Sequence, residues 1–175
     1  MVLIKDKKEA IDIILEQKVL ALFQGESEWG PRALGNRSML FDARNPLAQE
    51  IVNGIKKREW WRPFAGTIML EYAHEWFEMG TLKESPYMSF AIDAKEIALK
   101  TIPSIIHSGT CRIQTVTKEQ NKHFYELIEE FYNRTGVPII LNTSLNLAGH
   151  PLAETIDNVM EMCEKSEMKH VYFPN

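Results

Sequence analysis

The chain has 175 residues, of which 45% are hydrophobic and 25% are charged, so its composition is that of a globular domain large enough to bury a core. Its apolar runs fall short of the roughly 18 residues that a transmembrane helix needs, and its N-terminus is not a signal peptide, so we expect a cytoplasmic protein with no membrane partner. The formal net charge of −4 argues against general nucleic-acid binding.

The predicted elements alternate between helices and strands along the chain. The first half is expected to contain a helix from residue 6, a strand at 19–23, a loop at 24–35, a short strand at 38–42, a helix from 45–46 and a strand at 65–71. The second half is expected to contain strands at 88–93 and 112–116, a helix at 118–134, a strand at 137–141, a helix at 154–165 and a closing strand at 170–173. This interleaving predicts an α/β or mixed α+β layer fold in a single domain over residues 1–175.

Local signals mark the helix ends. Asp6 followed by Glu9 is typical of a capping box, Asn45 before a proline is typical of a helix start, and Gly136 is typical of a helix C-terminus. The apolar side chains expected to face the core from successive helices are Ile11, Ile14 and Leu15, then Leu47, Ile51 and Ile55, then Phe124, Leu127, Ile128 and Phe131, and finally Ile156, Val159, Met160 and Cys163.

Basic side chains are concentrated in one part of this acidic chain. Residues 32–62 contain seven basic and three acidic side chains, a local net charge of +4 that leaves −8 for the remainder. The seven basic residues are Arg32, Arg37, Arg44, Lys56, Lys57, Arg58 and Arg62. A local cationic stretch in an acidic protein indicates a focused anion-binding site rather than a wide basic surface.

The first candidate for such a site is the loop Glu-Trp-Gly-Pro-Arg-Ala-Leu-Gly-Asn-Arg-Ser at 28–38, which follows a predicted strand. Its arginines, Arg32 and Arg37, offer planar guanidinium groups for phosphate or carboxylate, and its glycines allow the backbone to approach a ligand closely. The alternative is a structural loop in which both arginines pair with Glu26 and Glu28.

A second candidate begins at Lys56, at the end of a predicted helix, and continues through Arg58 and Arg62. Cations at a helix C-terminus complement the helix dipole, which explains one or two of them but less easily all of those present here. The neighbouring Trp60 and Trp61 are suited to stacking on a base or an arginine, and are equally compatible with a place in the core or in an interface.

The third candidate is the segment Gly-Thr-Cys-Arg-Ile-Gln-Thr-Val at 109–116. It contains Thr110, and Arg112 begins a predicted strand whose alternate residues face opposite sides. Arg112 is therefore either a surface charge or a clamp on a ligand.

The fourth candidate directly follows the predicted strand at 137–141 and contains Asn142, Thr143, Ser144 and Asn146. Ligands in α/β sheets gather at the carboxyl ends of strands, where hydroxyl and amide groups bind phosphate oxygens or a ribose. The same residue types also favour an ordinary turn, so the pattern alone leaves both interpretations open.

No nucleophile or metal-ligand pattern stands out in the sequence. It lacks a catalytic-triad signature, a Walker A loop and a paired-cysteine zinc site, and Cys111 and Cys163 are expected to be reduced core thiols. The histidines are scattered and are expected to be surface or core residues: His74, His107, His123, His150 and His170. The remaining chemistry is the positioning of anions and the neutralisation of their charge, as in phosphoryl and adenylyl transfer.

The four segments together resemble the C-terminal domain of the O-carbamoyltransferases that include nodulation protein U and antibiotic-tailoring enzymes. They occur in the order and approximate spacing of that family, and the resemblance runs from about Lys18 to the end of the chain. It implies a YrdC-like fold, a twisted mixed β-sheet with flanking helices around a positively charged cavity. It also implies binding of carbamoyl phosphate and ATP, the latter with Mg²⁺, and formation of a carbamoyl adenylate with release of phosphate and pyrophosphate.

The family's Lys-x-Arg and Ser-x-Asn elements fall on Lys56 and Arg58, and on Ser144 and Asn146. With the candidates above, the residues expected to act on the anions in catalysis are Arg32, Lys56, Arg58, Arg62 and Arg112. Those expected to contact substrate or nucleotide are Arg37, Thr110, Asn142, Thr143, Ser144 and Asn146, and no metal ligand is expected. The family more often has phenylalanine at Trp29 and Leu145, an acidic residue at Ser108 and His150, and proline at Gly66.

In the family that the chain resembles, a separate Kae1-like N-terminal domain with an iron site passes the carbamoyl group to a hydroxyl acceptor. The sequence contains no counterpart of that domain or of its metal-binding histidines, so we expect either a split subunit or an excised domain that needs a Kae1-like partner. Two other functions stay open. One is a non-catalytic module that holds carbamoyl phosphate or a nucleotide, and the other is an RNA-binding YrdC-like domain, whose RNA affinity would depend steeply on salt.

Overall fold

The computed structural model describes residues 1–174. Within this range the helices are α1 (Lys7–Leu15), α2 (Ala48–Lys56), α3 (Ala73–Trp76), α4 (Glu96–Thr101), α5 (Lys122–Thr135) and α6 (Ile156–Lys165). The strands are β1 (Val2–Ile4), β2 (Leu20–Phe23), β3 (Arg37–Phe41), β4 (Ala65–Met69), β5 (Ala91–Asp93), β6 (Thr110–Val116), β7 (Ile139–Ser144) and β8 (His170–Tyr172). Two 3₁₀ turns, Leu70–Tyr72 and Pro103–Ile105, precede α3 and follow α4.

The strands of residues 1–174 form one mixed sheet in the order β1-β8-β2-β3-β7-β4-β6-β5. β7 is antiparallel to both neighbours, β3 and β4, whereas β4 and β6 are parallel. The end of β7 therefore lies beside the beginnings of β3, β4 and β6. Across these strands, Asn142 of β7 pairs with Ala65 of β4, and the next residue of β4, Gly66, pairs with Ile113 of β6. Three segments that are far apart in sequence thus reach one edge of the sheet.

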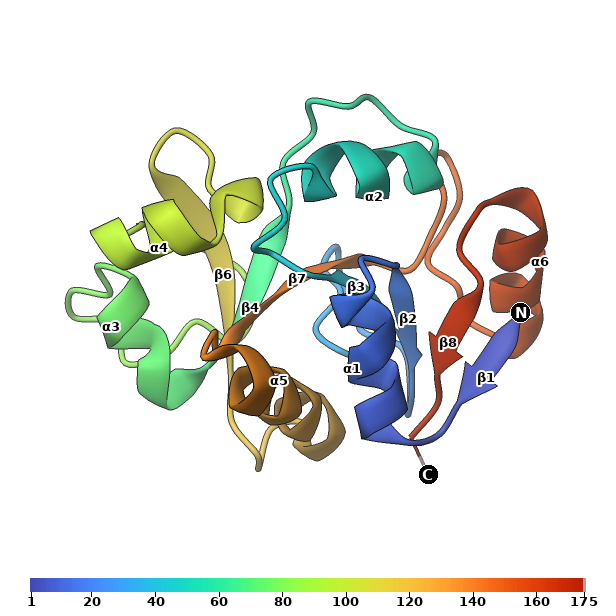
Figure 1. Ribbon diagram of the computed structural model, residues 1–175, viewed down its shortest axis with the longest axis horizontal. Helices are drawn as coiled ribbons and strands as arrows, with labels where there is room; N and C mark the ends of the chain where they lie inside the picture. The colour runs from blue at the N-terminus through green and yellow to red at the C-terminus, as the bar shows by residue number, and fades with distance from the viewer. Residues whose placement is uncertain (175) are drawn as a thin grey trace.

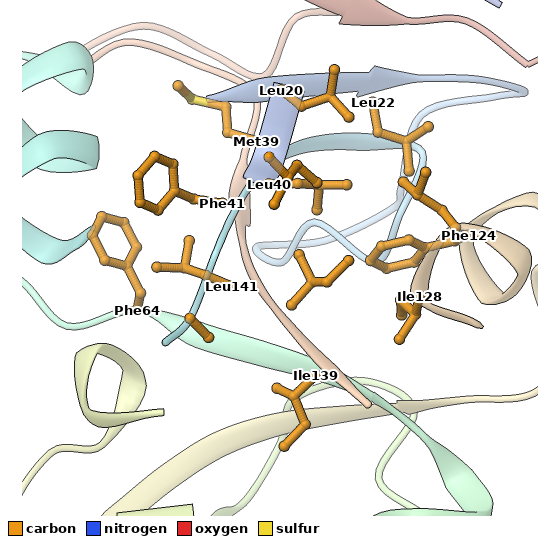
Figure 2. Packing of buried hydrophobic residues seen from close by; sticks show 14 of the residues in the cluster. Leu20, Leu22, Met39, Leu40, Phe41, Phe64, Phe124, Ile128, Ile139 and Leu141 are labelled. Atoms are coloured by element: carbon orange, nitrogen blue, oxygen red, sulfur yellow. The ribbon is translucent and has the colours of Figure 1, made fainter. Parts of the chain in front are cut away.

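Helices cover both faces of the central strands (Figure 1). α1 and α5 pack on one face, and α2 lies over the other, above β3 and β7. The core accordingly has two layers: Phe41 and Phe64 lie on the α2 side, and Phe124 and Ile128 of α5 lie on the opposite side (Figure 2). Every residue of β3 is buried, as expected for a strand covered on both faces.

Side-chain caps explain where the helices begin. The Asp6 side chain accepts a hydrogen bond from the Lys8 backbone N–H at 2.7 Å, and Asn121 caps α5 in the same way. Thr155 and Asn158 form a reciprocal capping box at α6. α5 is the longest of these helices with 14 residues, and no helix in the described range is long and apolar enough to span a membrane.

Several boundaries differ from those predicted. α5 begins four residues later than expected, because Asn121 caps it and residues 117–120 form a separate turn. β7 continues to Ser144, so Asn142, Thr143 and Ser144 belong to a strand rather than to a loop. β1, α3 and α4 were not predicted, since each is too short to show a hydrophobic period.

The buried faces of two helices also differ from the prediction. Leu47, expected to be buried, is 58% exposed, whereas Asn53 and Lys56 face inward from α2. The helix turns this way because both polar side chains find hydrogen-bond partners in the interior. In α6, Met160 is 45% exposed and Met162 is buried in its place.

Candidate functional site

A cavity of about 300 Å³ lies at the edge of the sheet where β7 ends and β4 and β6 begin. Its wall is built from the loop after β2, the segment between α2 and β4, the loops before β5 and β6, and the end of β7. The polar residues of the wall are Arg32, Arg58, His107, Thr110, Arg112, Asn142, Thr143 and Ser144. No lining residue of the described chain is an aspartate or glutamate, so the cavity is positively charged, as predicted.

The carboxylate of Glu28 holds the loop that carries Arg32. Its Oε1 atom accepts hydrogen bonds at 2.7, 2.7 and 3.2 Å from three backbone N–H groups of the loop, those of Leu34, Asn36 and Arg37. Glu28 is therefore engaged with the backbone, and the ion pairs required by the purely structural interpretation of the loop do not form. Within residues 1–174, Arg32 has neither a hydrogen bond nor an ion pair from its side chain.

Gly35 allows the same loop to approach α5. Its φ angle is +106°, a conformation that side chains rarely adopt, and a Cβ atom there would lie 2.2 Å from the ring of Phe124. Any larger residue would push the loop away from the helix. The second glycine of the motif is thus explained by packing and positions Arg32 only indirectly.

A buried polar trio, Thr67, Gln114 and Asn142, lies beneath the loop. The Thr67 hydroxyl donates to Gln114 Oε1 at 2.9 Å and accepts from Asn142 Nδ2 at 3.0 Å. The Asn142 amide also donates to the carbonyl of Ala33 at 3.1 Å, and the Gln114 amide donates to that of Leu34 at 2.9 Å. Because the trio comes from β4, β6 and β7, the central sheet fixes the position of the Arg32 loop.

Arg32 and Arg112 are two cations of the cavity without a counter-ion. Burial lowers the pKa of Arg32, and the positive charge of Arg112 lowers it further, so the two guanidinium groups are within electrostatic reach of each other. Neither side chain forms an ion pair or a hydrogen bond with any other described residue. Like charges held together in this way are relieved by an anion between them.

Arg58 is held by one edge of its guanidinium group. Its Nε atom donates to Asn53 Oδ1, and the group lies 4.6 Å from the centre of the Phe64 ring. Burial lowers the pKa of Arg58, and the charge of Arg62 adds to this effect. Its two terminal nitrogens have no partner among residues 1–174, so they are available to a ligand in the cavity.

Lys56 lies beside a second hollow of about 410 Å³, which shares Arg58 and Ser144 with the cavity. The lysine is 2% exposed, and its ammonium donates to the carbonyl of Ser144, to the carbonyl of Asn146 at 2.9 Å and to Asn146 Oδ1 at 3.0 Å. Burial, followed by the charge of Arg58, lowers the pKa of Lys56 to about 7. The lysine thus holds the chain after β7 in place, and only a small part of it is exposed at the wall of the hollow.

The Lys-x-Arg and Ser-x-Asn elements therefore meet in the structure. Ser144 Oγ donates to Asn146 Oδ1 at 2.7 Å, the oxygen that also accepts from Lys56. The Asn146 amide donates to the carbonyl of His150 at 2.9 Å. These bonds shape the wall between the cavity and the hollow, and Thr143 adds a half-buried hydroxyl on the cavity side.

Arg37, predicted as a substrate contact, does not reach the cavity. It is 4% exposed, and its guanidinium donates to four carbonyl groups while lying 3.7 Å from the centre of the Phe23 ring. The four acceptors are the backbone oxygens of Gln24, Gly25, Asn36 and Glu154. Arg37 ties the loop to the segment before α6, which is a structural role.

Two further predicted residues, Arg62 and Thr110, lie at the site, but each already interacts with a neighbouring residue of the chain. Arg62 borders the hollow, and its Nε atom forms an ion pair with Glu59 at 2.7 Å. The Thr110 hydroxyl lines the cavity and donates to the carbonyl of His107 at 3.0 Å. Both residues are brought to the site, but each already has an internal partner.

The sequence interpretation missed much of the cavity wall. His107 lines the cavity, and the apolar wall includes Phe64, Met88, Ile105 and Cys111. Burial raises the pKa of the Cys111 thiol to about 12, so it is not a nucleophile near neutral pH. The turn that places His107 has positive φ angles at Ser108 and Gly109, and the glycine is the only sign of this turn in the sequence. No three His, Cys, Asp or Glu side chains among residues 1–174 converge as metal ligands.

Comparison with known sequences identifies one family. The sequence model described as carbamoyltransferase C-terminus matches residues 11–175. The chain is 41% identical over 150 residues to nodulation protein NolNO of Sinorhizobium fredii, an alignment that covers 84% of this chain and 22% of that protein. The chain thus spans less than a third of this curated relative.

Solved structures share the fold at low sequence identity. Full-length HypF in its phosphate- and nucleotide-bound form matches with a TM-score of 0.69 and 17% identity, covering 98% of this chain and 25% of that one. Sua5 of P. abyssi complexed with L-threonine matches with a TM-score of 0.67 and 16% identity, covering 100% of this chain and 51% of that one. The predicted YrdC-like fold is thereby confirmed.

Proposed function

The chain belongs to the carbamoyltransferase C-terminal family, and from this premise we propose that it binds carbamoyl phosphate and ATP and forms a carbamoyl adenylate. The observation that carries the proposal is the convergence of Arg32, Arg58 and Arg112 from three separate segments on one cavity. No carboxylate of the described lining offsets their charge. Such a cluster is unfavourable until an anion occupies it, so it favours a ligand that carries phosphate.

The adjoining hollow gives room for a second anion. It shares Arg58 and Ser144 with the cavity, so ligands in the two spaces would meet beside that arginine. Carbamoyl phosphate and a triphosphate repel each other in water. Fixed cations at the junction lower this repulsion and hold the reacting groups together without any nucleophile from the protein.

The proposed reaction converts carbamoyl phosphate, ATP and water into carbamoyl adenylate, phosphate and pyrophosphate. Water first cleaves carbamoyl phosphate, which releases phosphate and leaves a carbamate. A carbamate oxygen then forms a bond to the α-phosphorus of ATP, and the bond from that phosphorus to the pyrophosphate oxygen breaks. The arginines neutralise the charge that the two departing groups carry. No described lining residue of the cavity is a carboxylate, and Glu59 beside the hollow is paired with Arg62, so Mg²⁺ would enter on the phosphates of ATP as part of the substrate.

Transfer of the carbamoyl group to a final hydroxyl acceptor belongs, in this proposal, to a partner. The chain corresponds to 22% of nodulation protein NolNO, and the acceptor chemistry is assigned to a Kae1-like domain or subunit outside the cavity described above. The HypF crystal form with bound phosphate and nucleotide supports a nucleotide site in a protein that contains this fold.

The test is calorimetric titration of the chain with carbamoyl phosphate and with ATP, followed by exchange of labelled pyrophosphate into ATP. We expect both ligands to bind and the exchange to depend on carbamoyl phosphate. Arg134→Ala on α5 is a matched control, because it also removes one arginine but lies outside the cavity and the hollow. It should bind and exchange like the unmodified chain.

The outcomes separate two functions. Binding with exchange supports an activating domain. Binding of both ligands without exchange contradicts the adenylate and supports a module that holds them for a partner. If neither carbamoyl phosphate nor ATP binds, the proposal as a whole is contradicted.

A further inference from the structure

A third space, of about 450 Å³, opens beside Arg32 and Arg112. We call it the aromatic hollow, because Trp29 and Tyr87 line it. It shares both arginines with the cavity, and none of its described lining residues belongs to the hollow beside Lys56. The cavity therefore adjoins two different spaces, each through a different part of its wall.

The two aromatic side chains of this hollow are open to solvent. Trp29 is 99% exposed and Tyr87 is 68% exposed. Single exposed apolar side chains are common on protein surfaces, but a group of them around a concave space marks a binding site. No lining residue of the aromatic hollow within the described chain is an aspartate or glutamate, so nothing in its wall offsets the charges of Arg32 and Arg112.

The segments that position the arginines also position the aromatic residues. Trp29 belongs to the same loop as Arg32. Tyr87 lies two residues after Ser85, whose backbone N–H and hydroxyl donate to β6 at 2.7 and 3.0 Å, and β6 is the strand that carries Arg112. Each arginine of the hollow thus has an aromatic side chain on its own segment or on the segment fastened to it.

Exposed rings next to unneutralised cations favour one class of ligand. The guanidinium groups of Arg32 and Arg112 suit the oxygens of a phosphate. An exposed aromatic ring offers a stacking surface to a flat heterocycle, and every nucleobase has such a face. A nucleotide carries both groups in one molecule, whereas carbamoyl phosphate would engage the arginines and leave the rings uncovered.

We propose that the base of ATP binds in the aromatic hollow, stacked on Trp29, and that its phosphates reach into the cavity past Arg32 and Arg112. The inference rests on the proposed function and specifies where the nucleoside lies. The triphosphate then extends toward Arg58, beside which the proposed function brings the two substrates together. Tyr87 adds a second, smaller ring at the edge of the base.

The other exposed tryptophans do not compete for this role. Trp60 and Trp61 are 73% and 55% exposed, and their sequence also suggested stacking on a base. Neither residue lines the cavity, the hollow beside Lys56 or the aromatic hollow. Trp60 therefore provides a matched control for Trp29, because it is an exposed tryptophan in the same chain away from the proposed base.

The experiment is a titration of the unmodified chain and of Trp29→Ala, Trp29→Phe and Trp60→Ala with the magnesium complexes of ATP and of tripolyphosphate. Tripolyphosphate supplies the phosphates without the nucleoside. In Trp29→Ala the dissociation constant for ATP should rise about tenfold, the effect of losing one base stack, while that for tripolyphosphate stays within about twofold. Trp29→Phe should retain most of the ATP affinity, and Trp60→Ala should bind both ligands like the unmodified chain. Because the Trp29 ring is 99% exposed, urea unfolding of Trp29→Ala should match that of the unmodified chain.

The possible failures are distinct. Equal ATP affinity of Trp29→Ala and the unmodified chain overturns the inference and leaves the proposed function standing. Equal weakening of ATP and tripolyphosphate in Trp29→Ala also overturns it, because the tryptophan would then shape the loop rather than bind a base. A loss of ATP affinity in Trp60→Ala as large as in Trp29→Ala would place the base elsewhere. If the unmodified chain binds neither ATP nor tripolyphosphate, the nucleotide site of the proposed function is wrong, and the inference with it.

Discussion

Two groups of cations border the same connected spaces but use their charges in opposite ways. In the lysine cluster, formed by Lys56, Ser144 and Asn146, the ammonium is buried and donates to three oxygens of the chain. In the arginine pair, formed by Arg32 and Arg112, the guanidinium groups have no partner among residues 1–174 and repel each other. The first group has hydrogen-bond acceptors within the protein, and the second lacks them in the described chain.

The difference teaches that a cationic motif does not by itself show what the cation binds. Both groups lie in segments that suggest anion binding in the sequence. Only the arginine pair is left for a ligand, whereas the lysine cluster builds the wall that such a ligand would contact. The two groups should consequently differ in what their removal changes: stability for one and affinity for the other.

The largest effect is expected from Lys56→Ala. The substitution removes three hydrogen bonds made by a side chain that is 2% exposed and leaves the carbonyl of Asn146 without its donor, so the free energy of unfolding should fall by about 3 kcal/mol. Urea unfolding at pH 7.5 measures this fall, with the midpoint moving and the slope unchanged. Lys57→Ala is the control, because Lys57 is the exposed neighbour of the same charge and should change stability by less than about 0.5 kcal/mol.

If Lys56→Ala and Lys57→Ala unfolded at the same urea concentration, the contrast between the lysine cluster and the arginine pair would be wrong. Lys56 would then be as free as the arginines, and its hydrogen bonds would contribute nothing measurable.

The next effect is expected from Arg112→Ala, which tests the other side of the comparison. Removing this uncompensated charge should weaken carbamoyl phosphate binding by about 2 kcal/mol, roughly thirtyfold, because a charged hydrogen bond is lost. The free energy of unfolding should stay within about 0.5 kcal/mol of the original, since no internal partner is left behind. Calorimetric titration and urea unfolding of the same sample give both numbers, and a fall in stability larger than the fall in affinity would contradict the assignment.

The pH dependence of stability refines the description of Lys56. Burial lowers its pKa to about 7 from 10.5 in the unfolded chain, so the unfolded chain binds more protons between these values. The free energy of unfolding should therefore rise with pH in that window relative to Lys56→Ala, by up to about 1.4 kcal/mol per pH unit, and should be flat below it. Unfolding both proteins between pH 6 and pH 10 measures the difference. A flat difference throughout would mean that the oxygens of Ser144 and Asn146 keep the lysine charged despite its burial.

Sequence patterns foretold the parts of the molecule that depend on local information. The apolar run of β2 and the glycine after α5 predicted their elements, and the cationic segments led to Arg32, Arg58 and Arg112. The patterns failed where contacts with segments distant in sequence determine how a helix or a side chain is oriented. The inward turn of α2 depends on oxygens after β7 that accept from its last residue. Arg37 differs from Arg32 in part because the carbonyl of Glu154 reaches it from the segment before α6.

The smallest effect is expected at Arg62, which lies between the two kinds of cation because it borders the hollow but pairs with Glu59 on the surface. Exposed pairs contribute little, so Arg62→Ala should weaken ATP binding by only about twofold, roughly 0.5 kcal/mol. Glu59→Gln releases Arg62 and should strengthen ATP binding by a similar factor. Titration of the original chain, both single variants and the double variant gives the coupling between them. If the variant with both substitutions kept the higher ATP affinity of Glu59→Gln, this gain would come from removing a negative charge near the phosphates. Arg62 would then resemble Lys56, a cation whose bonding is used within the protein.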